Sequence, residues 1–255
     1  MGPEGDDTDE ATEPHDAANL PPASPVAAKH RWGLGAYIVV ELAYLLTAAA
    51  FLPLLSDGGP LPLPTVLVAV SAPSVIAAGL ALLITMIRGN GPGPDLKLFW
   101  SVRAVGLGLL FGFGGLFFIV PAAMLYATAV GPDATSAAGA AFGGFLAAWP
   151  WAVAVFVLVV FLAPVCEEIV YRGLLWGAAE QRWGRWAALA VTTVLFAVAH
   201  LEFERTPLLI LIAIPIGLAR LYSRSLLASI VVHQVVNLLP GVVLMLSVAG
   251  AIPQL

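Results

Sequence analysis

The sequence of 255 residues is poor in charge and almost lacks cysteine. Charged residues make up 11% of the chain and hydrophobic residues 60%, whereas ordinary soluble domains carry roughly 25% charged residues. This composition excludes a soluble globular protein and indicates a membrane protein. The single cysteine, Cys166, excludes an internal disulfide and a CxxC metal site. Basic residues form no patch with aromatics, so nucleic acid is not an expected partner.

Acidic residues are concentrated at the N-terminus. Of the 16 acidic residues in the chain, seven lie in the first 16 positions: Glu4, Asp6, Asp7, Asp9, Glu10, Glu13 and Asp16. This segment is also rich in proline and has little apolar surface to bury, so we predict a disordered acidic tail over residues 1–31. An acidic start followed by a long apolar run is unlike a cleavable signal peptide.

Long apolar runs fill most of the remaining sequence. About 20 apolar residues are enough to cross a bilayer as a helix. Seven runs of suitable length lie between polar or Pro/Gly-rich breaks: Gly33–Leu55, Pro64–Ile87, Ala104–Val130, about Phe145–Ala179, Trp186–Leu201, Pro207–Tyr222 and Leu226–Ala249. An Ala/Gly-rich stretch, Ala137–Trp149, could add a short or re-entrant segment. We therefore predict an all-α, polytopic transmembrane bundle of about seven to eight spans, with a polar cavity embedded in the membrane.

The basic residues indicate how the bundle is oriented. Cytoplasmic loops of membrane proteins collect Lys and Arg. With seven spans and the N-terminus inside, one side holds Lys29, Arg31, Arg88, Lys97, Arg103, Arg182, Arg185, Arg220 and Arg224, whereas the opposite loops hold only Arg205. We predict a multi-pass cell-membrane protein, with a bacterial plasma membrane expected, whose N-terminus is cytoplasmic. The lipid bilayer is then its first partner.

Polar side chains interrupt the late apolar runs. Ionisable groups at bilayer depth cost several kcal/mol each, so they mark sites held by a function or a partner. The groups concerned are Glu167, Glu168, Arg172, His200, His233 and Asn237. Outside the tail, His200 and His233 are the only histidines of the chain. The function of the protein should therefore be sought among these side chains.

The two adjacent glutamates are expected to have different roles. Glu168 and Arg172 are spaced i,i+4, which suits a helical ion pair, and burial in hydrocarbon makes that pairing close to obligatory. Glu167 points about 100° away from Glu168 on the same helix. Glu167 is therefore predicted to lack an internal partner and to face the cavity as the chemically active carboxylate. Glu168 and Arg172 are predicted to support the helix.

Glu167 and His200 lie at similar distances from a predicted turn near Gly184. They are 17 residues before and 16 residues after it, so both lie about 25 Å up antiparallel helices and could meet. Phe196 is one helical turn before His200 and should pack on the same face. His233 and Asn237 are spaced i,i+4 on the last span and share a face.

Two kinds of chemistry are compatible with these residues. Glu167 and His200 could remove a proton from water, while His233 and Asn237 donate hydrogen bonds to the oxyanion that forms on a peptide carbonyl. Alternatively Glu167, His200 and His233 could hold a divalent metal such as Zn²⁺, with an open position for water. The sequence leaves both open, and we favour the metal-independent version because an asparagine suits hydrogen-bond donation better than zinc ligation.

Three motifs in order carry a resemblance to a known family. Glu167-Glu168-x-x-x-Arg172, Phe196-x-x-x-His200 and His233-x-x-x-Asn237 resemble the CAAX prenyl protease and bacteriocin-processing family (CPBP, or Abi, family), which includes the type II CAAX prenyl endopeptidases. The resemblance covers roughly Phe145–Leu239. It implies an intramembrane endopeptidase, in a family filed among metallopeptidases, that cuts a membrane-anchored and in some members prenylated protein or peptide. It also implies Glu167 and His200 as the water-activating pair, and His233 with Asn237 as oxyanion or ligand residues. We accordingly divide the chain into residues 1–31 (tail), 32–140 (N-terminal transmembrane helices) and 141–250 (peptidase-like core).

Other functions are less well supported by the sequence. An aspartyl protease needs two membrane aspartates, but Asp57, Asp95 and Asp133 all fall in loops. Ser229 and His233 are spaced i,i+4 and could form a dyad, although a packing role suits that serine better. A proton-coupled carrier would use the same polar groups as a relay, but no inverted repeat is visible. A catalytically idle membrane adaptor on the same scaffold is the remaining alternative.

Overall fold

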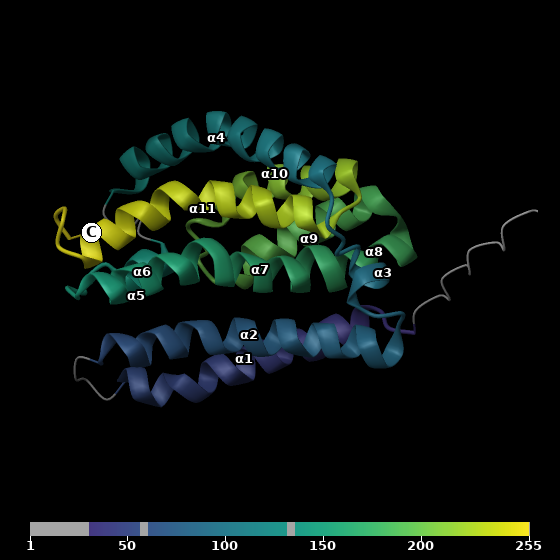
Figure 1. Cartoon of the computed structure of the whole chain (residues 1–255), viewed down its shortest axis with the longest axis horizontal. Helices are drawn as coiled ribbons and strands as arrows, with labels where there is room; N and C mark the ends of the chain where they lie inside the picture. Colours follow the sequence, from purple (N-terminus) through teal and green to yellow (C-terminus); the bar gives the residue numbers. More distant parts are fainter. Residues whose placement is uncertain (1–30, 57–60, 132–135, 255) are drawn as a thin grey trace, which may run out of the picture.

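The computed structural model describes residues 31–56, 61–131 and 136–254, and within them it contains helices and no β-strand. Of the predicted acidic tail, all but residue 31 lies outside the described residues. Figure 1 shows the helices in chain order: α1 (Leu34–Ser56), α2 (Leu63–Arg88), α3 (Pro92–Leu96), α4 (Val102–Val130), α5 (Ala137–Phe142), α6 (Trp149–Val157), α7 (Ala163–Glu168), α8 (Trp176–Trp183), α9 (Arg185–Ala199), α10 (Thr206–Ser223) and α11 (Leu226–Val248). Two π-helical segments, η3 (Leu158–Leu162) and η4 (Ile169–Leu175), join α6, α7 and α8 into one continuous run.

The predicted helical membrane bundle is confirmed. Six of the described helical runs are long and apolar enough to cross a membrane. The seventh predicted span corresponds to α9, whose 15 residues cover only about 22 Å, less than the hydrocarbon core of roughly 30 Å. The Ala/Gly-rich stretch forms the short helix α5, and the Ser136 hydroxyl caps it by accepting a hydrogen bond from the Gly139 amide.

The helices pack in layers around the run from α6 to α8 (Figure 1). Helices α1 and α2 form an antiparallel hairpin on one side, and α4 lies along α11 and α10 on the opposite side. Helix α9 packs against α8 and α10. The predicted turn between α8 and α9 is present, and its Gly184 adopts a positive φ of 84° that favours glycine.

Glycines allow α4 to approach α11 closely. A Cβ atom on Gly108 would lie 2.7 Å from the Cβ of Val231, and one on Gly112 would lie 2.9 Å from the Cβ of Val235. The two glycines are spaced i,i+4, the small-residue pattern that lets membrane helices pack at short distance. Helix α11 carries His233, so this contact supports the helix that presents a candidate site residue.

The π-helical segments leave backbone carbonyls available to side chains. In η3 the Val159 carbonyl accepts a hydrogen bond from Asn237 Nδ2 at 3.1 Å, and in η4 the Arg172 carbonyl accepts one from Arg220 Nε at 3.0 Å. Such segments are rare and frequently occur at functional sites. Here they flank α7, which ends with the two adjacent glutamates.

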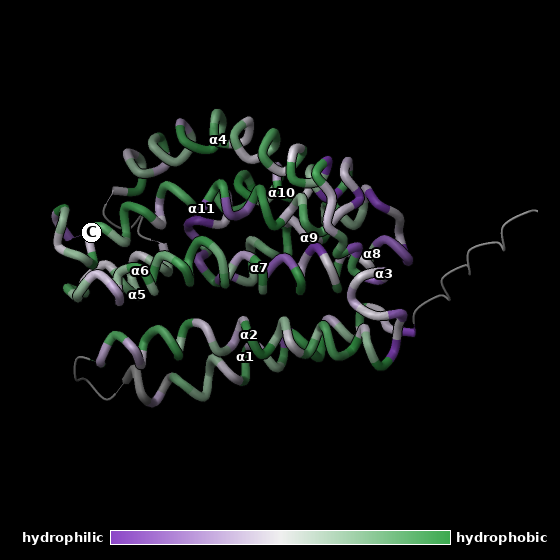
Figure 2. The backbone as a smooth tube through the Cα atoms, in the orientation of Figure 1, coloured by the Kyte–Doolittle hydropathy of each residue, from purple (hydrophilic) through white to green (hydrophobic). Residues whose placement is uncertain are grey.

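Hydrophilic positions gather at one end of the bundle and in its interior (Figure 2). At that end the Arg31 amide donates to the Arg88 carbonyl, and the Leu226 amide donates to the Lys97 carbonyl. Arg31, Arg88, Lys97 and Arg224 are therefore brought to the end where α1 and α11 begin. Arg205 precedes α10, at the opposite end of that helix from Arg224. Which side of the membrane the end with Arg31 faces stays a prediction.

Candidate active site

The side chain of Glu168 is the centre of a buried polar network. Its Oε1 atom accepts hydrogen bonds from Arg172 Nη1 at 3.1 Å and from His233 Nδ1 at 2.9 Å. The side chains of Glu168 and Arg172 are fully buried, and that of His233 is 5% exposed. The predicted ion pair of Glu168 with Arg172 is confirmed. Burial makes each partner depend on the other, because an unpaired charge in this interior would be very costly.

Glu167 is the more accessible of the two glutamates. Its side chain is 25% exposed, and its Oε2 atom lies 3.7 Å from His233 Nε2. The prediction that Glu167 lacks an internal partner is therefore wrong. Helix α11 packs against α7 and places the His233 ring between the two carboxylates, a contact between helices that the spacing within one helix cannot reveal.

The ring of Phe196 connects the polar residues. It lies under the Arg172 guanidinium, with the carbon Cζ 4.4 Å from the ring centre. The rings of His200 and His233 contact it with centroid separations of 4.6 and 5.6 Å. The prediction that Phe196 packs on the face of His200 is confirmed. Both histidines therefore contact one aromatic ring.

The described partners of His200 lie on α9 and α1 and do not include Glu167. Its Nδ1 atom lies 2.7 Å from the Phe196 carbonyl oxygen. It also interacts electrostatically with Glu41 of α1. Within the described residues no hydrogen bond or ion pair joins His200 to Glu167, so the direct pairing of these two residues stays a prediction.

Asn237 lies one helical turn beyond His233, as its spacing predicts. One N–H of its amide is used by the Val159 carbonyl. The side chain is only partly buried, which leaves the second N–H and the amide oxygen for another partner. Asn237 can therefore still donate a hydrogen bond to a bound carbonyl.

The described residues do not form the metal site that the sequence left open as an alternative. They contain no group of three or more His, Cys, Asp and Glu side chains placed to hold a metal ion, so Glu167, His200 and His233 are not arranged as a ligand set. Zinc in a catalytic site needs three protein ligands around one point. Nδ1 of each histidine has a protein partner, which leaves Nε2 as the available nitrogen of each ring.

Two residues weighed for other chemistries have structural partners instead. The Ser229 hydroxyl donates to the Ile216 carbonyl at 3.2 Å, away from His233. Asp95 accepts hydrogen bonds from the Trp32 indole and from Asn90. The remaining loop aspartates, Asp57 and Asp133, lie outside the described residues.

The structure also contains an apolar hollow between α4 and α10. Its volume is about 480 Å³, and its lining includes Phe118, Leu211 and Pro215. An apolar lining does not match the predicted polar cavity, which stays a prediction for the region around Glu167.

Glu41 of α1 is not among the site residues that the sequence predicts, and the structure places it next to Tyr171. The Tyr171 hydroxyl donates to its two carboxylate oxygens at 3.4 and 3.5 Å. A signal was present in the sequence: Tyr37, Glu41 and Tyr44 have the i, i+4, i+7 spacing that places side chains on one helix face.

Residues 148–239 match a protein-family model described as type II CAAX prenyl endopeptidase Rce1-like. The match covers about a third of the chain, and we refer to this segment, by its similarity, as the Rce1-like domain. It includes Glu167, Phe196, His200, His233 and Asn237, and its extent agrees with the predicted resemblance. No curated protein and no solved structure gave a significant match to the chain.

The Rce1-like domain and the helical bundle together support an intramembrane protease. Helix α1, with Glu41, lies outside the matched segment. The same is true of α2, α3, α4 and α5, so five of the eleven described α-helices lie outside the matched segment.

Proposed function

We propose that the protein is an endopeptidase that hydrolyses a peptide bond of a membrane-anchored protein or peptide, using Glu167 as the general base. The observation that carries the proposal is the arrangement of His233 between two carboxylates. One of them, Glu168, is fully buried and forms an ion pair with Arg172. The other, Glu167, is accessible. A base must reach water, and only Glu167 combines accessibility with this position.

The charged groups around His233 favour an imidazole ring that donates hydrogen bonds. Glu167 and Glu168 bring two negative charges, and Arg172 brings one positive charge. We propose that both ring nitrogens of His233 carry a proton. Nδ1 then donates to Glu168, Nε2 lies 3.7 Å from Oε2 of Glu167, and the four groups together have no net charge. In a site of low dielectric constant such balance avoids the cost of an uncompensated charge.

The hydrolysis then proceeds in two steps. In the first, Glu167 takes a proton from water while the water oxygen adds to the carbonyl carbon, and the carbonyl oxygen becomes an oxyanion. Glu167 is now neutral, so the Nε2–H of His233 donates to the oxyanion instead. In the second step Glu167 returns its proton to the leaving nitrogen, the C–N bond breaks, and a carboxylic acid and an amine result.

Asn237 and His200 complete this mechanism. The free N–H of Asn237 supplies a second hydrogen bond to the oxyanion from the same face of α11. His200, which also contacts Phe196, orients the attacking water. Its Nδ1 donates to the Phe196 carbonyl, so Nε2 is the nitrogen available to that water.

The proposed substrate is a peptide segment next to a membrane anchor, of which a prenylated CAAX-type C-terminus is one form. The site lies inside an apolar bundle, so the anchor can stay among lipid while the peptide enters from the end where the basic residues gather. This orientation makes that end cytoplasmic.

Cleavage of lipid-anchored peptides by the purified protein tests the proposal. The same peptide carrying a prenyl group, an acyl chain or no lipid would be incubated with the protein, and the products identified by mass spectrometry in H₂¹⁸O. We expect cleavage of at least one anchored peptide, with ¹⁸O in the new carboxyl group. Absence of cleavage across the panel in reconstituted bilayers would reject the proposal.

A chelator arm tests the metal-independent mechanism. We expect purified protein to keep its activity after treatment with a chelator and to contain no stoichiometric zinc by elemental analysis. Zinc that is lost together with activity, and that restores activity on return, would make a metal essential and would replace Glu167 as the sole activator of water.

A further inference from the structure

A polar stripe crosses the otherwise apolar helix α1. Tyr37, Glu41 and Tyr44 share one face of this helix, and the exposed residues on its other faces, such as Ile38 and Leu46, are apolar. Tyr37 is buried and the other two are partly buried. A carboxylate on a membrane helix is costly unless partners hold it, so the partners of Glu41 indicate its role.

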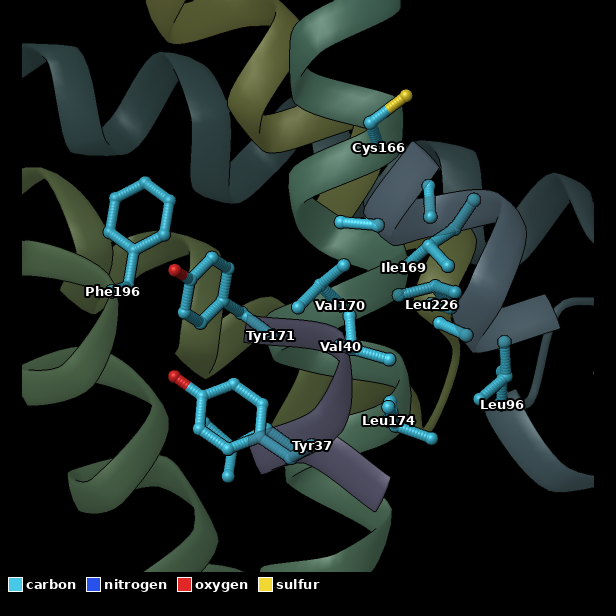
Figure 3. Packing of buried hydrophobic residues seen from close by; sticks show 14 of the residues in the cluster. Tyr37, Val40, Leu96, Cys166, Ile169, Val170, Tyr171, Leu174, Phe196 and Leu226 are labelled. Atoms are coloured by element: carbon cyan, nitrogen blue, oxygen red, sulfur yellow. The ribbon is translucent and has the colours of Figure 1, made fainter. Parts of the chain in front are cut away.

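Two tyrosines lie beside Glu41. The Tyr171 hydroxyl donates to it from η4 at 3.4 and 3.5 Å, and Tyr37, one turn earlier on α1, interacts with it as well. The rings of these tyrosines contact each other edge to face, with centroids 6.2 Å apart. Figure 3 shows the two rings beside each other, with their hydroxyl groups on the same side.

The same contacts lead from Glu41 to the candidate site. The Tyr171 ring packs against Phe196 with a centroid separation of 5.4 Å, and Phe196 packs against His200 at 4.6 Å. Glu41 interacts electrostatically with His200, and Tyr44 does so with Glu167. The stripe on α1 therefore faces both proposed water-handling residues.

We infer that Glu41 is a positioning residue of the active site, supplied by a helix outside the Rce1-like domain, and that its carboxylate holds His200 ready to orient the attacking water. The inference rests on the proposed function. Because the Phe196 carbonyl can only accept a hydrogen bond, Nδ1 of His200 must carry a proton. This contact fixes the ring and leaves Nε2 as the nitrogen that can bind water. A negative charge beside this ring stabilises its orientation and any positive charge that it gains.

The substitution Glu41→Gln separates charge from packing. The amide oxygen can still accept the Tyr171 hydroxyl, so the variant removes the negative charge and little else. Nuclear magnetic resonance of protein labelled with ¹⁵N-histidine gives a readout independent of activity, since the chain has only four histidines. We expect the imidazole resonances of His200 to shift, and to shift more than those of His233. Unchanged His200 resonances would overturn the inference.

Cleavage kinetics provide the second readout. Loss of a partner that orients a functional histidine typically costs about 10- to 100-fold, and we expect the loss in kcat with KM changed by less than about twofold. Glu41→Asp, which keeps the charge, should retain more activity than Glu41→Gln. A raised KM with unchanged kcat would overturn the positioning role.

Two further variants serve as a control and as a substitute for Glu41→Gln. Tyr222→Phe removes a hydroxyl from an exposed ring on α10 and should leave kcat and the His200 resonances unchanged. If Glu41→Gln does not fold, Tyr171→Phe removes the hydroxyl that holds Glu41 while keeping the ring on Phe196, and it should shift the same resonances. If the wild-type protein cleaves no peptide, the proposed function fails, and the resonances alone still decide whether Glu41 acts on His200.

Discussion

The N-terminal and C-terminal spans of this bundle differ in the fraction of each helix that is buried within the protein. In α1 only 6% of the candidate span is buried within the protein, and in α2 and α4 the values are 28% and 22%. In the spans Trp149–Trp183, Thr206–Ser223 and Leu226–Val248 they are 44–50%. The later spans hold one another and the polar network, whereas the earlier ones mostly face outward. Their inward contacts are therefore limited to one face of each helix.

Small and polar residues make several of these inward contacts, alongside apolar ones such as Val40. Helix α4 touches α11 through Gly108 and Gly112, and α1 reaches the site through Glu41. Lipid tails are as apolar as leucine, so burial of apolar side chains does little to drive helices together in a membrane. Close approach and hydrogen bonds have to do so instead. Substitutions in the two regions should therefore have sharply different effects.

The largest effect is expected from Arg172→Ala in the later spans. It leaves Glu168 as a buried charge without its guanidinium, which costs about 3–5 kcal/mol. The melting temperature and the yield of folded protein in detergent should both fall steeply. Arg182→Ala, on an exposed position of α8, is the matched control and should have little effect. A stable but inactive Arg172→Ala protein would instead place Arg172 among the residues that act on substrate.

Next comes Glu167→Gln, which should remove activity without unfolding the protein. The amide keeps the shape and loses the base, so kcat/KM for peptide cleavage should fall at least about 100-fold, equivalent to roughly 2.7 kcal/mol. Glu168→Gln is the informative partner, since it should lower the melting temperature more than Glu167→Gln does. Turnover that stays at the wild-type rate in Glu167→Gln would remove this residue from the mechanism.

A smaller loss is expected from Gly108→Val in α4. The new side chain would meet Val231 of α11, and overpacking of this kind costs about 1–3 kcal/mol. Gly106→Val is a close control on the same helix, because nothing lies within 4 Å of a Cβ at that position. Thermal unfolding of both variants measures the difference. Equal melting temperatures would mean that the close contact between α4 and α11 contributes no stability.

The smallest effect is expected from Leu46→Ala on the outer face of α1. Leu46 is 71% exposed, so its loss should change the free energy of unfolding by less than about 0.5 kcal/mol. Leu174→Ala in η4, where the side chain is fully buried, should cost about 2–5 kcal/mol. If the two variants melted at the same temperature, the contrast between the outer and inner spans would not hold.

The sequence by itself determined the membrane helices and the residue types of the site. Apolar runs of this length can be satisfied in a bilayer only as helices, which is why the predicted runs and the observed helices coincide within a few residues. The i,i+4 pair of Glu168 and Arg172 and the packing of Phe196 beside His200 were equally local, because spacing along one helix determines which side chains share a face.

Only the tertiary structure decided how the helices meet. His233 lies between Glu167 and Glu168 because α11 crosses α7, and Glu41 reaches Tyr171 because α1 packs against η4. The two π-helical segments around α7 free carbonyls for Asn237 and Arg220. Periodicity within one helix contains no information about its neighbour's rotation, depth or crossing point, since those follow from packing among all the helices at once.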